Sequence, residues 1–443
     1  MRSPIDERER NNLFGGRESL RDEDSKPHIF IRYRLTPAEG LSLEEAAARV
    51  LIITTLRTMR KLVYETDDQR LDTAGMITNM DSSGYIELAL PLSYCSEREG
   101  LTHLLLMITA AAEYNYTETF WIESVELPPE FVHRYKGPRF GVEGIRNLFK
   151  VPERPLIGLI IKPRRGLPIS TLLEHCSEAL RGGADFIVDD LLMVDPDGEL
   201  EFLSRIDRFS NLVAQLSQTT GERKLYFANI CTSPIQAIDY AHKAVSAGVG
   251  GLLVDAFTMG IGGVEHIVNS IDGKIPIIST NMGSGIMTRG TWVGISQFYP
   301  TGMTEAVISK LCRVAGVDAV HTGTSASECY GEDAWGPASR SLTQKLYGMP
   351  ASMAVAEGDL TVANLWENIN SLGRDLLVEP TSGILNFPGG AAKGAAAFRL
   401  LAEELLPEMT PEIAHSTIQN LSNKNRDLRE GLKYFEYTPP RIG

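Results

Sequence analysis

Eight short apolar segments, each the length of one strand, recur between residues 156 and 380 at intervals of about thirty residues. Segments that are apolar on both faces are typical of parallel strands covered on both sides, and the amphipathic stretches between them predict helices. Eight strand and helix pairs in a row predict an α/β fold, a closed (β/α)8 or TIM barrel. The eight segments are LIGLIIKP (156–163), DFIVDD (185–190), KLYFANI (224–230), GGLLVDAF (250–257), IPIISTN (275–281), VDAVHTG (317–323), MAVAEG (353–358) and DLLVEP (375–380).

The region before the barrel has a different pattern, in which strands are mixed with two helices. Two segments alternate apolar and polar residues, as half-buried strands do, and two others have the periodicity of helices. Strands and two helices within about 110 residues predict a small α+β domain of the ferredoxin-like type over residues 28–140. The segments are HIFIRYRL (28–35), LEEAAARVLIITTLRTMRKL (43–62), GYIELALPL (84–92) and LTHLLLMITAAAEY (101–114).

These patterns divide the chain into three parts. Residues 1–27 are rich in Arg, Glu and Asp and predict a flexible polar tail. The α+β domain follows, and the Pro- and Gly-rich segment ELPPEFVHRYKGPRFG (126–141) predicts the link to the barrel. We expect the barrel, with a helical extension at its carboxyl end, to occupy residues 150–443.

The overall charge and the cysteine pattern restrict the partners of the chain. A formal net charge of -14 argues against the basic surface that binding to nucleic acid or to an anionic membrane requires. The five cysteines are widely spaced and lack the spacing of a zinc site. No apolar segment reaches the roughly 20 residues that cross a membrane. We therefore expect a cytoplasmic protein that acts on a small molecule and binds neither nucleic acid nor a membrane.

The carboxyl ends of the strands are where a barrel of this kind places its catalytic groups. Lys162 ends an apolar strand, where partial desolvation would favour its neutral form and let it act as an acid or a base. It can equally lean into solvent or pair with a carboxylate. Asp189 and Asp190 end the next strand, and because side chains alternate along a strand, only one of them can point into the barrel mouth as a candidate metal ligand. The alternative for both aspartates is a helix cap or a hydrogen bond to a loop.

Two further features are candidate phosphate sites. His321 begins HTGTSAS (321–327), where its ring and the loop N–H groups can bind phosphate; a buried histidine that is hydrogen-bonded to backbone is the alternative. Four glycines in GILNFPGGAAKGAAAF (383–398) precede a helix, whose amino end attracts phosphate. Glycine-rich turns are common in loops, so this second motif is weak by itself.

Five of these motifs together resemble a known family, the RuBisCO large-chain superfamily, in the family's order and at its spacing. The segment VELPPEFVHRYKGPRFGVEGIR (125–146) also resembles the family's link between domains. The resemblance implies a barrel behind an N-terminal domain, and a homodimer or higher homo-oligomer whose active sites are shared between subunits. The five motifs are GLIIKPRRGL (158–167), ALRGGADFIVDD (179–190), YFANICT (226–232), DAVHTGT (318–324) and GILNFPGGAAKGA (383–395).

The resemblance also identifies what is missing from the family's magnesium site. In that family the second strand carries a lysine that becomes carbamylated, followed by an aspartate and a glutamate, and the three bind Mg2+. The matching residues here are Val188, Asp190 and Leu191, so the resemblance implies that Asp190 points into the barrel mouth and that Asp189 faces the surrounding helices. Valine forms no carbamate, so we expect no carbamylated lysine, and two of the three ligands are absent. Whether Mg2+ binds elsewhere in the site stays open.

Matching the remaining motifs to the family yields an expected set of site residues. The expected catalytic residues are Lys162, Asp190 and His321, and the candidate metal ligands are Asp190 and Glu357. The expected substrate-binding residues are Arg164, Asn229, Asn281, Thr324, Glu357, Ser382 and Gly383.

Three functions stay open on these residues. The first is an enzyme that keeps the superfamily's enolate chemistry, as an isomerase, an enolase or a decarboxylase, on a keto-sugar phosphate or a sugar acid, with Lys162 as acid and base. Such a chain is a RuBisCO-like protein of the form IV type and not a carboxylase. The second is a rebuilt metal site that uses Asp190, Glu357, Asp359 or Glu328. The third is a ligand-binding or regulatory protein without catalysis.

Overall fold

The computed structural model describes most of the chain, and the described residues form two compact units. None of their helices combines the length and the apolarity that a membrane span requires. The described residues are Ile5, 7–20, 26–193, 201–288, 291–293, 297–299, 301–324 and 335–438. The first unit comprises Met1–Lys136, Gly283–Leu311 and Leu346–Met349, and the second comprises Gly137–Met282, Cys312–Lys345 and Pro350–Gly443.

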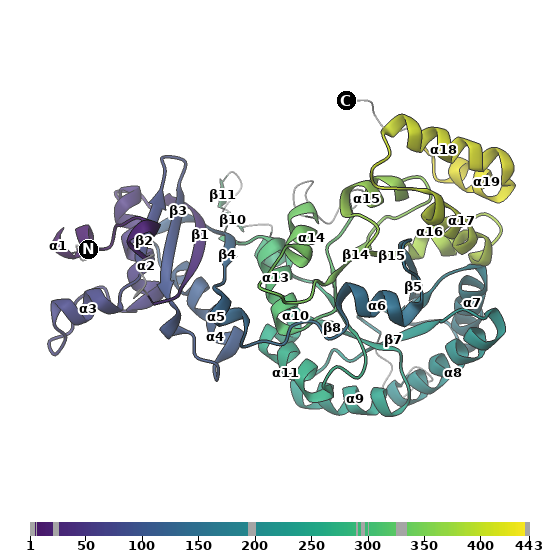
Figure 1. The fold of residues 1–443 in the computed structure, drawn as a ribbon, viewed down its shortest axis with the longest axis horizontal. Coiled ribbons are helices and arrows are strands. Elements are labelled where there is room, and N and C mark those ends of the chain that lie inside the picture. The colour runs from purple at the N-terminus through teal and green to yellow at the C-terminus, as the bar shows by residue number, and fades with distance from the viewer. Residues whose placement is uncertain are drawn as a thin grey trace. The chain divides into compact units, whose positions relative to one another are not determined.

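The second unit contains a closed barrel of eight parallel strands (Figure 1). This confirms the predicted fold class, and each strand falls inside one of the eight predicted segments. The last strand of the barrel pairs with the first and closes the cylinder. In barrel order the strands are β5 (Leu156–Ile161), β6 (Phe186–Asp189), β7 (Leu225–Asn229), β8 (Gly251–Asp255), β9 (Ile277–Thr280), β13 (Ala319–His321), β14 (Met353–Glu357) and β15 (Leu376–Glu379).

Helices surround these strands, as the amphipathic stretches predict (Figure 1). On α7, for example, Leu172, Cys176 and Leu180 are buried along one face. Two helices at the carboxyl end, α18 and α19, form the predicted extension. The helices are α6 (Gly141–Phe149), α7 (Ile169–Gly182), α8 (Phe202–Thr220), α9 (Pro234–Ser246), α10 (Ala256–Met259), α11 (Ile261–Ile271), α13 (Glu305–Ala315), α14 (Trp335–Thr343), α15 (Leu365–Leu372), α16 (Thr381–Leu385), α17 (Ala391–Glu404), α18 (Pro411–Lys424) and α19 (Arg426–Tyr434).

Large rings pack against glycines inside the barrel and fill the space that a side chain would otherwise occupy. Phe186 on β6 lies against Gly158 on β5, where an added Cβ would stand 2.2 Å from the ring. Phe227 on β7 lies in the same way against Gly251 on β8, at 2.3 Å. The two rings also meet edge to face, with centroids 5.6 Å apart. The interior is therefore a packed core and not a channel.

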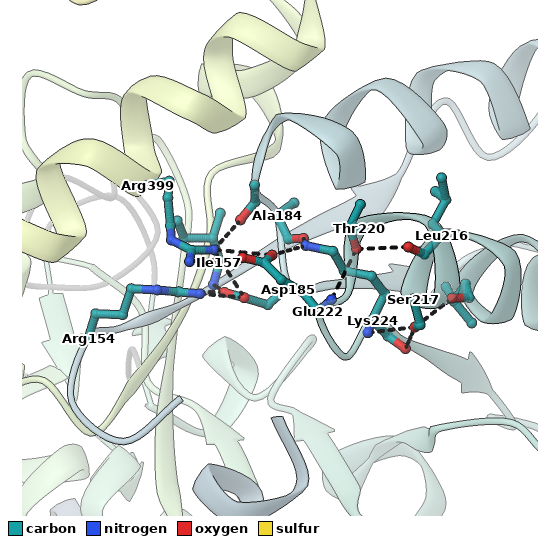
Figure 2. Close-up of polar contacts among 12 residues, drawn as sticks. Arg154, Ile157, Ala184, Asp185, Leu216, Ser217, Thr220, Glu222, Lys224 and Arg399 are labelled. Carbon is teal, nitrogen blue, oxygen red and sulfur yellow. Dashed lines mark hydrogen bonds and ion pairs between the residues drawn. The ribbon is translucent and has the colours of Figure 1, made fainter. Parts of the chain in front are cut away.

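Buried charges connect the amino ends of β5, β6 and β7 (Figure 2). Arg154 precedes β5 and donates two parallel hydrogen bonds to the Asp185 carboxylate, of 2.6 and 2.7 Å. Asp185 also accepts the backbone N–H of Ile157, at 2.8 Å. Lys224, directly before β7, donates to the carbonyl of Ala184 at 2.8 Å. Because a barrel carries its chemistry at the opposite end, this network serves stability.

The first unit contains a five-stranded sheet in the order β12-β4-β1-β3-β2. Its four antiparallel strands and main helices follow the order β-α-β-β-α-β, which confirms the predicted ferredoxin-like arrangement. The fifth strand, β12 (Thr301–Met303), pairs in parallel with β4 and comes from the segment after β9, a pairing that the sequence pattern does not predict. The other elements are α1 (Glu7–Asn12), β1 (His28–Pro37), α2 (Leu43–Thr55), α3 (Asp67–Thr73), β2 (Met76–Met80), β3 (Tyr85–Pro91), α4 (Gly100–Thr109), β4 (Thr117–Glu126), α5 (Pro129–Val132), α12 (Gly285–Thr288), β10 (Thr291–Val293) and β11 (Gln297–Tyr299).

Part of the segment predicted as a flexible tail over residues 1–27 is instead folded onto this sheet. Leu13 is buried, and its carbonyl accepts the backbone N–H of Ile77 on β2 at 2.7 Å. Arg17 lies over the Phe30 ring, with Cζ 4.0 Å from the ring centroid. Its Nε also pairs with a carboxylate oxygen of Glu87 at 2.7 Å. Charges that suggest a solvated tail are thus used in contacts with the sheet.

We expect Glu87 to make this unit sensitive to acid. Burial alone would raise the pKa of its carboxyl, but hydrogen bonds from Arg17, Thr78 and Arg32 outweigh burial and lower the pKa to about 2. A carboxyl with a lower pKa in the folded than in the unfolded protein stabilises the fold above the unfolded pKa, and this contribution disappears as the pH falls through the folded pKa. For Glu87 the loss therefore falls between pH 4.5 and about 2.

Chemical denaturation of the Glu87→Gln variant across this pH range measures the effect. The variant should be less stable than the unmodified chain at neutral pH and should lose less stability on acidification, because it has no carboxyl to protonate. Glu126→Gln is the control, since the Glu126 side chain is half exposed and also pairs with Arg17. Equal acid dependence in the unmodified chain and Glu87→Gln would contradict the assignment.

Candidate active site

Lys162 and Asp190 lie together at the carboxyl ends of the neighbouring strands β5 and β6. The Lys162 side chain is 45% exposed, and its Nζ lies 3.8 Å from Oδ2 of Asp190, whose side chain is 15% exposed. The other carboxylate oxygen accepts the backbone N–H of Leu192 at 2.8 Å. Two alternatives that the sequence left open are therefore both present: Lys162 is paired with a carboxylate, and Asp190 is hydrogen-bonded to a loop. An amine within reach of solvent stands at the mouth of the barrel.

Asp189 contacts the helix layer, on the side that the family resemblance implies for it. It is buried, and its Oδ2 lies 2.8 Å from Nε of Arg205 on α8. It also accepts hydrogen bonds from the hydroxyl of Tyr226 and from the backbone N–H of Asn229, each at 2.9 Å. This network fixes the end of β6 and therefore the backbone position from which the Asp190 side chain extends.

His321, Glu357 and Glu379 form a cluster at the ends of β13, β14 and β15. Nδ1 of His321 lies 2.9 Å from Oε2 of Glu357, and Nε2 lies 3.5 Å from Oε2 of Glu379. One possible ligand atom from each residue lies within 4.8 Å of the others. Among the described residues, these three side chains form a group of His, Cys, Asp or Glu that could hold a metal ion.

The charges in this cluster act strongly on one another. Burial disfavours the charged imidazolium, but Glu379 and Glu357 outweigh burial and raise the pKa of His321. Burial, reinforced by the charge of Glu357, raises the pKa of Glu379 to about 7 even though His321 opposes the change. Burial would also raise the pKa of Glu357, yet its hydrogen bond with His321 lowers that pKa. Negative charge on both sides of the ring suits a proton or another cation better than the phosphate that the sequence suggests for His321.

Lys162 connects the two groups. Its positive charge acts on both Glu357 and Glu379. Strand β5, which it follows, pairs with β15 on one side and with β6 on the other. Titratable side chains therefore end five consecutive strands, β6, β5, β15, β14 and β13. Such an arrangement can transfer protons and can hold a cation beside a polar substrate.

Glu379 is the residue of this site that the sequence prediction missed. It is the final residue of β15, and its Cα pairs with that of Glu357 on β14. The available signal was an acidic residue that ends an otherwise apolar strand, in DLLVEP. The family motif starts farther along, near Gly383, and does not include it.

Two of the predicted substrate-binding residues hold backbone groups of the site. Nδ2 of Asn229 donates to the carbonyl of Asp190 at 3.2 Å, and its Oδ1 accepts the backbone N–H of Cys231 at 2.8 Å. Nδ2 of Asn281 donates to the carbonyl of His321 at 3.0 Å. These amides therefore position the strand ends that carry Asp190 and His321.

The other predicted substrate-binding residues have different surroundings. Arg164 and Ser382 are exposed. Thr324 is buried, and its hydroxyl donates to the backbone carbonyl of Gly358 at 2.7 Å. Gly383 is buried in α16, where an added Cβ would stand 2.5 Å from the backbone oxygen of Leu360. Close packing alone thus requires a glycine at position 383.

The family's magnesium position lacks ligands here apart from Asp190. Val188 is buried in the core of the barrel, and Leu191 packs against the same core. Neither side chain carries an oxygen or a nitrogen, so these residues do not fit a carbamate-bound Mg2+ ion. Of the other acids that the sequence suggests as ligands, Asp359 is exposed after β14, and Glu328 lies outside the described residues.

Comparison with known proteins relates this geometry to one family. The family described as ribulose bisphosphate carboxylase large chain, catalytic domain, matches residues 141–433. The ribulose bisphosphate carboxylase of Archaeoglobus fulgidus is 27% identical over 409 residues, which cover 87% of this chain and 90% of that protein. A ribulose bisphosphate carboxylase-like protein of the same organism is 26% identical over 297 residues, which cover 67% of this chain and 66% of that protein.

Solved structures share the fold. The octameric ribulose-1,5-bisphosphate carboxylase/oxygenase of Pyrococcus horikoshii has a TM-score of 0.84 at 22% identity and covers 97% of this chain and 99% of its own. The dimeric archaeal Rubisco of Hyperthermus butylicus has a TM-score of 0.81 at 21% identity, with 97% and 100% covered. The family match extends over well more than half of the residues. This chain therefore belongs to the ribulose bisphosphate carboxylase large-chain family.

Proposed function

We propose that this chain is an enzyme that forms an enolate at the mouth of its barrel and is not a CO2-fixing carboxylase. In such a reaction a base removes a proton from the carbon next to a carbonyl group, and the electron pair moves onto the carbonyl oxygen. Return of the proton to another atom makes the enzyme an isomerase or an enolase. Loss of CO2 in place of the proton makes it a decarboxylase. The proposed substrate is a keto-sugar phosphate or a sugar acid.

The observation that carries this proposal is the position of Lys162. Its amine ends β5 at the mouth of the barrel, where a substrate can reach it, with the Asp190 carboxylate 3.8 Å away. A neutral amine can accept the proton from carbon, and the resulting ammonium group can return it to carbon or oxygen. The Asp190 carboxylate is held by the backbone N–H of Leu192 and therefore keeps a constant position beside the lysine. Lys162 thus supplies both halves of a proton transfer, and Asp190 positions it.

Two substitutions support a reaction other than carboxylation. By resemblance, Val188 and Leu191 stand where the family carries two ligands of its Mg2+ ion. Aliphatic side chains cannot take over that role, because Mg2+ requires oxygen ligands. We therefore propose that the chain is a RuBisCO-like protein of the form IV type.

The charges at the mouth restrict the proposed substrate. Asp190, Glu357 and Glu379 are acidic, Lys162 lies beside them, and the exposed Arg164 follows it by two residues in the sequence. Several acids near the site would repel a bisphosphate, whereas one phosphate or one carboxylate can still pair with the available cations. We therefore propose a substrate with a single anionic group of this kind.

We also propose that the chain assembles into a homodimer or a higher homo-oligomer. The proteins with similar structures include an octameric and a dimeric form. The resemblance further implies that the N-terminal domain of one subunit completes the active site of another. Light scattering of the purified chain measures its mass in solution, and a monomer would contradict the proposal.

Exchange of carbon-bound protons with solvent deuterium tests the proposed reaction directly. The purified chain is incubated in D2O with a panel of keto-sugar phosphates and sugar acids, with and without a divalent metal, and each compound is followed by proton NMR. We expect at least one compound to lose the proton next to its carbonyl group or to form an isomerised or decarboxylated product. We expect no fixation of labelled CO2 onto ribulose bisphosphate, and such fixation would overturn the assignment.

A ligand-binding or regulatory protein without catalysis is the alternative, and the same panel distinguishes it. A ligand present at about 100 times its Kd adds about 2.7 kcal/mol to the free energy of unfolding and so raises the melting temperature. A compound that raises the melting temperature without exchange or product would support the binding protein and contradict the enzyme.

A further inference from the structure

Three buried polar atoms converge without a hydrogen-bond donor beside His321. They are Nε2 of His321 and the two carboxylate oxygens of Glu379. His321 is 4% exposed and Glu379 2%, so these atoms are shielded from bulk solvent. Within the part of the chain that the structure describes, none of the three atoms has a hydrogen-bond partner. Buried acceptor atoms that lack a hydrogen-bond partner require a physical explanation.

Glu357 determines which nitrogen of His321 carries a hydrogen. Its Oε2 lies 2.9 Å from Nδ1, and an ionised carboxylate only accepts, so Nδ1 is the donor. In the neutral ring Nε2 then presents a lone pair, and it faces Oε2 of Glu379 at 3.5 Å. Two lone pairs that face each other in a buried site repel, and neither has a hydrogen bond to compensate for its burial. A positive ion between Nε2 and the carboxylate removes both penalties.

The donor atoms select the kind of cation. Imidazole nitrogen together with carboxylate suits Zn2+, Fe2+, Co2+ or Mn2+, whereas Mg2+ and Ca2+ prefer oxygen ligands alone. A histidine bound to a metal usually donates its other ring N–H to a carboxylate, which is the relation of Nδ1 to Glu357. We propose that Nε2 of His321 and both carboxylate oxygens of Glu379 bind one divalent transition-metal ion, with Glu357 orienting the histidine.

The distances and charges of the cluster agree with this site. Nε2 of His321 and Oε2 of Glu379, two of the proposed ligand atoms, lie 3.5 Å apart. Bonds of about 2.0 to 2.2 Å to a shared ion place two ligand atoms at most about 4.4 Å apart, so small side-chain movements are sufficient. When both carboxyl groups are ionised, Glu357 and Glu379 carry the two negative charges that a divalent ion neutralises. Three protein donor atoms leave further coordination positions for water or for a substrate oxygen.

The alternative to a metal ion between His321 and Glu379 is a proton that the two side chains share. It would also place a positive charge between the two acceptors, but it would give the cluster no affinity for metals. Metal binding therefore separates the two, and it is measured without any substrate. The inference does not rest on the proposed reaction, so either one can fail while the other holds.

Titration of the full chain with Co2+ tests the site, because Co2+ bound to nitrogen and oxygen ligands absorbs visible light. The chain is first dialysed against a chelator and then against metal-free buffer. We expect the absorption to saturate at one Co2+ per chain, and the chain to retain one Zn2+ after gel filtration when Zn2+ is added instead. Glu379→Gln should abolish binding, and Glu357→Gln should weaken it by about 10- to 100-fold.

Matched measurements show that loss of binding is not loss of folding. In Glu379→Gln the introduced amide can donate to Nε2 of His321, so its denaturation midpoint without metal should equal or exceed that of the unmodified chain. Glu367→Gln on α15 is the control, because Glu367 is also partly buried with an oxygen that lacks a hydrogen-bond partner among the described residues; it should bind metal normally. Failure to retain metal, or equal retention by Glu379→Gln, would overturn the proposal.

Discussion

Replacing Arg154 with methionine should lower the free energy of unfolding of the barrel by about 3 to 5 kcal/mol, because it leaves a buried carboxylate without its main partner. The side chains of Arg154 and Asp185 are 7% and 3% exposed, and two parallel hydrogen bonds join them. Methionine fills much of the space of the arginine stem, so the loss is chiefly electrostatic. The remaining neighbours of Asp185 are the N–H of Ile157 and a nitrogen of Arg399 at 3.9 Å, which do not replace a bidentate pair.

Equilibrium denaturation of single and double variants measures this effect. The double variant with Arg154→Met and Asp185→Asn should be less destabilised than the sum of its single variants, because no unpaired charge remains buried. Arg426→Met is the control: it removes the exposed ion pair with Glu430 on α19 and should leave the denaturation midpoint unchanged. An Arg154→Met protein as stable as the unmodified chain would contradict the stabilising role assigned to the network drawn in Figure 2.

Lys162→Met should lower the rate of deuterium exchange into the active compound by about 100- to 10,000-fold, the usual contribution of a positioned acid or base. Methionine keeps the length and the apolar stem of lysine but cannot accept or donate a proton. Binding of the compound should change less than its turnover, because the contacts away from the reacting carbon remain. We therefore expect the compound still to raise the melting temperature of the variant while exchange is lost.

Lys243→Met is the matched control for this experiment. Lys243 lies on α9, its side chain is 44% exposed, and its Nζ pairs with Asp239 at 2.7 Å, so exposure and type of partner resemble those of Lys162. The control should exchange deuterium at the normal rate. Normal exchange by Lys162→Met would remove the lysine from the mechanism and leave the ends of β13 to β15 as the source of the base.

The barrel could be predicted because its signal is local and repeated. A barrel of this kind buries both faces of every strand and one face of every helix. The alternation of apolar strands with amphipathic helices is therefore visible in short windows of the sequence. The N-terminal segment and β12 could not be predicted in this way. Leu13 and Arg17 are held by β2 and by Glu87, and β12 is held by β4, all through contacts between residues far apart in the chain.

The site was predicted in part, for a related reason. Lys162, Asp190, His321 and Glu357 each end a predicted strand, so the barrel rule by itself brings them to one edge. Their partners depend on strand order and burial. Glu379 stood outside every family motif, and its significance comes from the 3.5 Å approach to Nε2 of His321.

The sequence by itself determined that the chain forms a (β/α)8 barrel behind a ferredoxin-like domain, that its candidate site residues lie at the strand ends, and that the side chains of Val188 and Leu191 cannot bind Mg2+. Only the tertiary structure decided which charges meet. It paired Lys162 with Asp190 and brought Glu379 to His321. The physical reason is that composition and periodicity specify which faces are buried, whereas electrostatic partners depend on distances of a few ångströms, which arise when the barrel closes.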